Sequence, residues 1–137
     1  MLKIMREIKF RGDYNGMFVY GNLINGIYEG KRFTQIENTD NSDFQKWNVR
    51  EESVGEFSGL IDKNGKEVYE GDIIETDING KVWEVKFENY GFVVISMCNK
   101  ISVEEKYTFS EYLNMLKKAK GNISVIGHMH YKEFLKA

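Results

Sequence analysis

The chain has 137 residues, and 19 Lys+Arg against 21 Asp+Glu give it a formal net charge of −2. This balance excludes a general attraction to nucleic acids or anionic membranes, which depends on clustered cationic charge. A hydrophobic fraction of 42% supports a folded core, while one Cys and no Pro exclude an internal disulfide scaffold and proline-rich ligand motifs. The longest apolar run, Phe92 to Ile95, is too short for a membrane helix, and the charged start has no signal-peptide hydrophobic region. We therefore expect a cytoplasmic protein with a single domain.

Residues 5–30 are predicted to form an antiparallel layer with two hairpins. Asn15-Gly16 and Asn25-Gly26 lie between strand-like runs, and Asn-Gly supplies the two positive-φ positions of a type I′ turn. The first turn places Tyr14 opposite Met17 and Gly12 opposite Val19. The second pairs Ile24 with Ile27 and Leu23 with Tyr28.

The alternation of residues in this layer predicts two different faces, because successive strand residues point to opposite sides. Lys9, Arg11, Asp13, Phe18 and Tyr20 share the more polar face. The other face is expected to be the core, and it consists of Ile8, Phe10, Tyr14, Met17, Val19 and Leu23.

Residues 37–53 lose the alternation and gather polar turn formers, which is typical of a long irregular loop. Phe44, Trp47 and Val49 are its candidate anchors, and a short helix within it is an open alternative.

Residues 54–130 return to strand patterns and are predicted to include a small SH3-like barrel, mainly over residues 72–97. An Asn64-Gly65 turn sets Ile61 against Val68. An Asn79-Gly80 turn sets Ile74 against Val85 and Thr76 against Trp83. Glu75 then lies opposite Glu84, an unfavourable pair. The apolar run Phe92–Met97 follows as a buried strand.

One helix is predicted over residues 109–119. Thr108 and Glu111 match a capping box, and Gly121 suits the position just beyond the helix end. Ile123 and Val125 begin a late strand. The predicted fold is therefore mainly β with one clear helix.

Three segments resemble the YopX-like protein family of bacteriophages and prophages. These are MREIKFRG from Met5, VGEFSGLIDKNGKEVYEGDII from Val54, and VIGHMH from Val125, where His128 replaces the usual Asn. The resemblance covers residues 5 to 130. It implies a mostly β, phage-encoded and self-associating protein in the bacterial host cell, with no catalytic motif to carry over.

Several clusters have residue types that occur in metal or catalytic sites. Asp62, Asn64 and Gly65 resemble the start of a calcium loop, but a tight turn explains them better without flanking helices. His128 and His130 would share a strand face, yet no third metal ligand is identifiable. Cys98 has no catalytic partner set. The carboxylates Glu67, Glu70, Asp72 and Glu75 are typical of a solvated face. We expect no catalytic residues, metal site or cofactor.

The most distinctive surface prediction is an interaction face made of Lys9, Arg11, Phe18 and Tyr20. Exposed aromatic residues often mark an interface with another subunit. Aromatic residues interleaved with cations can instead hold single-stranded nucleic acid. The sequence thus favours a non-enzymatic binding or assembly module that forms homo-oligomers or binds a phage or host protein. Nucleic-acid binding is the alternative, and a metal-dependent enzyme using acids near Asp72 with His128 or His130 ranks third.

Overall fold

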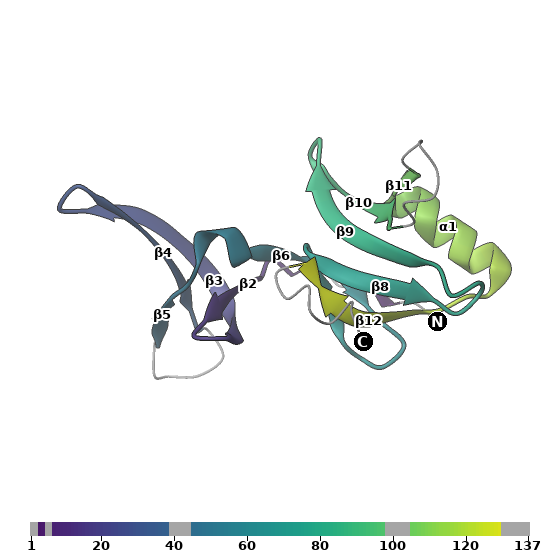
Figure 1. Cartoon of the computed structure of the whole chain (residues 1–137), viewed down its shortest axis with the longest axis horizontal. Helices are drawn as coiled ribbons and strands as arrows, with labels where there is room; N and C mark the ends of the chain where they lie inside the picture. Colours follow the sequence, from purple (N-terminus) through teal and green to yellow (C-terminus); the bar gives the residue numbers. More distant parts are fainter. Residues whose placement is uncertain (1–2, 5–6, 39–44, 98–104, 130–137) are drawn as a thin grey trace. The chain divides into compact units, whose positions relative to one another are not determined.

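A computed structural model of the protein describes residues 3–4, 7–38, 45–97 and 105–129. Its strands form two antiparallel sheets, and one α-helix is present within these ranges, as the sequence predicted (Figure 1). Contacts divide the chain into an amino-terminal unit, Arg6–Phe57, and a carboxy-terminal unit that joins Met1–Met5 to Ser58–Ala137. In the described ranges, no helix is long and apolar enough to cross a membrane.

The amino-terminal unit is a sheet with the strand order β6-β2-β3-β4-β5. Only the start of β6 belongs to it, where Gly55 and Glu56 pair with β2. The predicted loop 37–53 is irregular at its end but also contributes a strand and a 3-10 turn, while Phe44 lies outside the described residues. The elements are β2 (Phe10–Tyr14), β3 (Met17–Tyr28), β4 (Lys31–Glu37), β5 (Lys46–Asn48), η1 (Glu51–Ser53) and β6 (Gly55–Ile61).

The first predicted hairpin is confirmed and the second is wrong. Asn15 and Gly16 have φ of 52° and 90°, and Tyr14 faces Met17. Asn25 and Gly26, however, lie inside the twelve-residue strand β3, which turns at Glu29 and Gly30 with φ of 49° and 77°. Gly26 serves a packing role instead: it faces Phe33, and a Cβ there would lie 2.4 Å from the Phe33 Cζ.

The predicted core face of this unit is also partly wrong. Val19 is buried as expected, but Ile8 and Met17 are 78% and 66% exposed. The opposite face buries Arg11 and Asp13 instead. The pairing was predictable from the turn, whereas burial depends on which later segment covers each face of the sheet.

The carboxy-terminal unit is built on a five-stranded sheet with the order β11-β10-β9-β8-β12. The end of β6 also belongs to this unit and pairs with β1 and β7. The five-stranded path is open within the described residues, so the SH3-like barrel stays a prediction. The elements are β1 (Lys3–Ile4), β7 (Glu67–Tyr69), β8 (Asp72–Thr76), β9 (Val82–Glu88), β10 (Gly91–Ser96), β11 (Lys106–Thr108), α1 (Phe109–Ala119) and β12 (Ile123–His128).

The β8–β9 hairpin is present, but its predicted register is wrong by two residues. Ile74 faces Trp83, and Glu75 faces Val82, so the unfavourable Glu75–Glu84 pair does not form. The Asn79 side-chain oxygen accepts bonds from the Lys81 N–H and the Thr76 hydroxyl, both at 2.9 Å. This side chain stabilises a longer loop than the two-residue turn that was expected. A shift of two preserves the faces.

Helix α1 has the predicted bounds and capping box. The Thr108 hydroxyl accepts from the Glu111 N–H at 3.2 Å, and the Glu111 carboxylate accepts from the Thr108 N–H at 2.9 Å. At the other end, the left-handed residue is Lys120 rather than Gly121. The helix packs on the sheet, and the Trp83 and Tyr112 rings meet edge-on with centroids 5.3 Å apart. The core consists of Leu60, Val68, Ile74, Trp83, Val85, Val94, Tyr112, Leu116 and Ile123.

Candidate functional site

The structure brings together three of the four residues of the predicted interaction face. Arg11 pairs with Tyr20 across β2 and β3, and the Arg11 Cζ lies 4.1 Å from the centroid of the Phe18 ring. Arg11 is only 4% exposed. Lys9 lies just before β2, with its Nζ 3.6 Å from the Glu7 carboxylate. The Arg11 charge is therefore covered by an aromatic ring, and Tyr20 is the exposed aromatic of this face.

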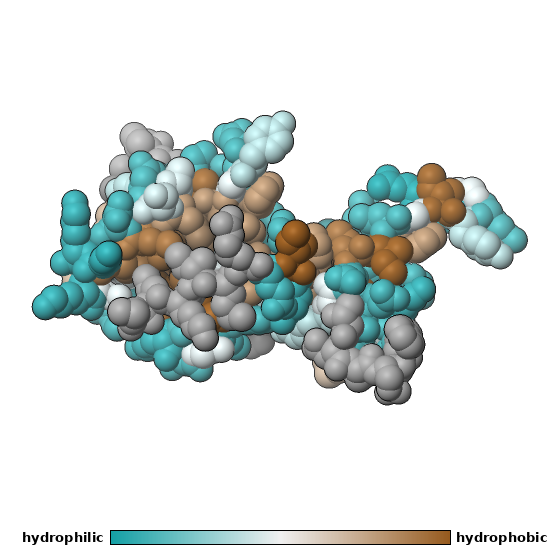
Figure 2. Space-filling view, turned by 180° about the vertical axis from the view of Figure 1, so that it is seen from behind, coloured by the Kyte–Doolittle hydropathy of each residue, from teal (hydrophilic) through white to brown (hydrophobic). Residues whose placement is uncertain are grey.

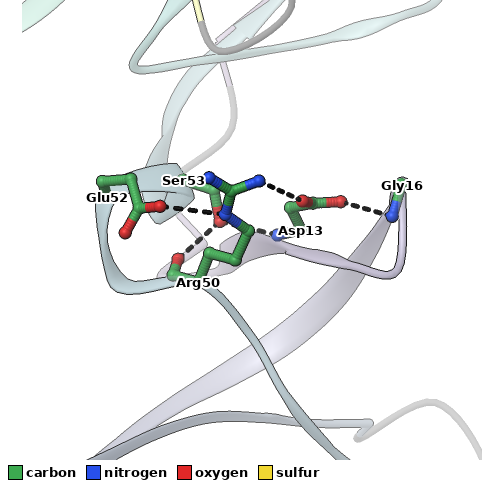
Figure 3. Close-up of polar contacts among 5 residues, drawn as sticks. All are labelled: Asp13, Gly16, Arg50, Glu52 and Ser53. Carbon is green, nitrogen blue, oxygen red and sulfur yellow. Dashed lines mark hydrogen bonds and ion pairs between the residues drawn. The ribbon is translucent and has the colours of Figure 1, made fainter.

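Beside this face lies a buried polar network that the sequence did not reveal (Figure 3). The Ser53 hydroxyl accepts from the Asp13 N–H at 2.7 Å and donates to the Arg50 carbonyl at 2.6 Å. One Asp13 carboxylate oxygen accepts from the Gly16 N–H at 2.9 Å, and the other lies 3.9 Å from the Arg50 guanidinium. These contacts join η1 to the first hairpin. Only the Asp13–Gly16 turn bond had a sequence signal, since Asp commonly caps such turns.

The carboxylates around Gly71 do not converge on one site. Asp72 is fully buried, with one oxygen accepting from the Tyr69 N–H at 2.8 Å and the other 3.4 Å from His128 Nδ1. Glu67 accepts from the Tyr69 hydroxyl, and Glu75 is exposed. Asp72 therefore fixes the β7–β8 turn. His130 and Cys98 lie outside the described residues, and within those described no group of three metal-ligating side chains gathers.

The Asp62 carboxylate is occupied by three backbone N–H groups. One oxygen accepts from Asn64 and Lys66, each at 2.8 Å, and the other accepts from Val125 at 2.9 Å. The Asp62 N–H also donates to the Lys66 carbonyl, so the loop spans residues 63–65 rather than the two residues predicted. This carboxylate joins a turn to β12.

The end of the β3–β4 hairpin is strongly exposed. We call residues 22–35 the arm. Strand β2 pairs with β3 only as far as Gly21, and β5 pairs with β4 only from Gln35. The arm is thus a two-stranded ribbon along most of its length (Figure 1). A turn at Asn25-Gly26, as expected from the sequence, would end this ribbon early, so the arm was not predicted.

The arm exposes hydrophobic surface and has a shallow groove. Ile27 and Tyr28 are 72% and 71% exposed, and Figure 2 shows strongly hydrophobic surface near the arm's tip. The groove has a volume of about 490 Å³. Its lining combines two aromatic rings, two cations, one carboxylate and one amide: Tyr28, Phe33, Lys31, Arg32, Glu29 and Gln35.

The comparisons with known proteins agree with the resemblance noted in the sequence. A search of curated proteins gave no match. The family model described as YopX protein matches residues 9–133, which is nearly the whole described fold and includes the arm, the buried polar network and the Asp62 and Asp72 turns. The chain belongs to the YopX protein family.

Proposed function

We propose that this protein is a phage-associated binding or assembly module of the bacterial cytoplasm that self-associates and works through the arm. The family membership supports the phage setting. The observation that carries the proposal is the arm itself, a ribbon with exposed Ile27 and Tyr28 at its end.

A two-stranded ribbon that is exposed to solvent has little stability of its own. Isolated hairpins are marginally stable, because two strands cannot bury a hydrophobic face. The arm lacks a third strand over residues 22–33 in the described part of the chain. Covering the Ile27 side chain would contribute roughly 1.5–3 kcal/mol. Contact with another molecule would therefore stabilise both the arm and the complex.

Light scattering at tens of micromolar tests the proposal, since the monomer mass is 16.0 kDa. We expect a larger species for the natural sequence and a shift toward the monomer for Ile27→Asp. The matched control is Ile126→Asp, which makes the same change at an exposed residue of β12. A natural protein that stays at 16.0 kDa, or two variants with equal effects, would count against the arm.

The groove supports single-stranded nucleic-acid binding as a second candidate function. Tyr28 and Phe33 offer rings for base stacking, and Lys31 and Arg32 offer cations for phosphates. Two features disfavour nucleic-acid binding. The Glu29 carboxylate would repel phosphates, and Arg32 already forms a 3.5 Å ion pair with Glu51. Fluorescence anisotropy with a labelled oligonucleotide tests it: binding should weaken as salt rises, and Lys31→Ala should reduce the salt slope.

A further inference from the structure

The outer edge of β3, residues 22–28, has no further strand paired with it in the described part of the chain. We propose that two chains join their β3 edges antiparallel about a two-fold axis at Asn25, so that one sheet continues through both. This inference rests on the proposed self-association and names its surface.

The hydrogen-bonding direction of β3 shows which of its groups are available. The β2–β3 pairing follows the two-residue Asn15-Gly16 turn, so Met17, Val19 and Gly21 direct their N–H and C=O groups toward β2. The alternation continues along the uninterrupted strand, so Leu23, Asn25 and Ile27 direct theirs toward the same side beyond the start of β2.

A bond on the opposite strand confirms this direction. Asn25 faces Thr34, and the Thr34 carbonyl accepts from the Val49 N–H at 3.1 Å, away from β3. In an antiparallel pair, residues facing each other direct their backbone groups either both inward or both outward. The Asn25 N–H and C=O therefore point out of the ribbon, where no strand is paired with them in the described residues.

The β3 edge has none of the features that protect natural edge strands from pairing. Charged side chains, Pro and bulges are the usual protection. Residues 22–28, Asn-Leu-Ile-Asn-Gly-Ile-Tyr, contain no charge and no Pro, and their register with β4 is continuous. The opposite edge differs: Lys31 and Arg32 lie at its exposed end, and Arg32 pairs with Glu51. The two edges of the same arm thus point to β3 as the one that pairs.

The residues of the β3 edge are also complementary to those of a second, antiparallel copy. An axis at Asn25 sets Leu23 of one copy opposite Ile27 of the other, which covers the exposed Ile27 with an apolar neighbour. Asn25 meets Asn25, and no like charges face each other. Each pair of outward residues exchanges two backbone hydrogen bonds. An axis at Leu23 would require Gly21, which already pairs with β2, and an axis at Ile27 would include the turn.

The decisive experiment uses charge at the axis position. Asn25→Lys and Asn25→Asp each place like charges opposite each other, so each variant alone should dissociate up to about fivefold more readily than the natural protein. An equimolar mixture of the two, with different tags, should form a mixed pair, because Lys now faces Asp. Far-ultraviolet circular dichroism checks that both variants fold; Asn25 is exposed, so neither change disturbs a core.

Cross-linking provides a second readout in a Cys98→Ser background. Directly opposed residues in an antiparallel hydrogen-bonded pair have Cα atoms about 5.5 Å apart, so a short thiol-specific cross-linker can join cysteines placed at both positions. Asn25→Cys should give a covalent dimer with such a reagent, and Arg32→Cys, on the other edge of the arm, should not. An oligomer that persists in both charge variants, with no cross-link at position 25, would overturn the edge pairing and leave self-association standing. A monomeric natural protein would overturn both proposals.

Discussion

The two units of this protein are stabilised in different ways. The carboxy-terminal unit buries a continuous apolar core between its five-stranded sheet and helix α1. The amino-terminal unit buries few apolar side chains, and Arg11, Asp13 and Ser53 are buried beside them. Its buried groups are joined by directional contacts: a ring over a guanidinium, and a hydroxyl between a backbone N–H and a carbonyl.

This difference follows from where the strands of each unit lie, either packed against a core or extended into the exposed arm. A unit that extends residues 22–28 of its twelve-residue strand β3 into an exposed ribbon has less surface left with which to build a core. Hydrogen bonds contribute only about 0.5–1.5 kcal/mol each, but an unmet buried partner costs more. The stability of the amino-terminal unit should therefore depend on single buried polar atoms. The stability of the carboxy-terminal unit should depend on the volume of its buried apolar side chains.

Each unit contains one tryptophan, which allows the two to be followed separately. Trp47 lies in β5 and Trp83 in β9. A Trp83→Phe background reports the amino-terminal unit, and a Trp47→Phe background reports the carboxy-terminal unit, by fluorescence during urea unfolding.

The largest effect should come from Leu116→Ala, which empties a buried position of the carboxy-terminal core. The expected loss is about 2–5 kcal/mol of unfolding free energy, from lost burial and the cavity left behind. The Trp83 signal should show it more strongly than the Trp47 signal. Met115→Ala, on an exposed position of the same helix, is the control and should change little. Equal shifts of both signals would mean that the units unfold as one.

Ser53→Ala should have the next largest effect, now in the amino-terminal unit. The change leaves the buried Asp13 N–H without its acceptor, while the Arg50 carbonyl loses the hydroxyl and keeps the bond from the residue 53 backbone N–H. We expect a loss of about 1–3 kcal/mol, read from Trp47. The control is Ser110→Ala, at an exposed position of α1. If the Trp47 signal does not respond, the polar network does not stabilise this unit.

The sequence predicted elements best where local chemistry determines them. Thr108 and Glu111 lie in one turn of the chain, and their capping box identified helix α1 correctly. Asn15-Gly16 likewise determined its own hairpin. Asn25-Gly26 misled, because the same pair fits inside a strand when a glycine is needed under the Phe33 ring and Glu29-Gly30 can form the turn.

The candidate sites depended on contacts that are distant in sequence, and these were not predictable. Ser53 is 40 residues from Asp13, and Val125 is 63 residues from the Asp62 carboxylate that binds its N–H. No periodicity encodes such pairs. The arm was missed for a related reason: it becomes visible only when β2 and β5 are known to stop before it.

Thr108→Ala tests a contact between residues that are close in sequence. It should lower the unfolding free energy less than Ser53→Ala does. The change removes the hydroxyl that accepts from the Glu111 N–H at the start of α1. We expect a loss of about 1 kcal/mol from the carboxy-terminal unit. Thr108→Ser keeps the capping oxygen and should recover most of the stability. If Thr108→Ser is as destabilised as Thr108→Ala, the cap is not the cause.

The smallest effect should come from Asp77, a charged contact in the unit that depends on its apolar core. The Asn122 N–H donates to one oxygen of the Asp77 carboxylate at 2.9 Å, and the Asn122 amide reaches the other at 3.3 Å. The backbone bond is the main cause that holds the pKa of Asp77 below its ordinary value of 3.8. A carboxyl whose pKa is lower in the folded state stabilises the fold at pH values above its unfolded-state pKa. This contribution is lost as the pH falls through the folded-state pKa.

Asp77→Asn isolates that contribution, because the amide oxygen can still accept from the Asn122 N–H but has no charge. The natural protein should be slightly more stable than the variant near neutral pH, and the difference should disappear as pH falls below the ordinary carboxyl range. Added salt should also reduce it, since the group is fully exposed. The control is Glu75→Gln, at an exposed position of the neighbouring strand β8. A difference that grows in acid would mean that the protonated Asp77, and not its anion, is the form that the fold prefers.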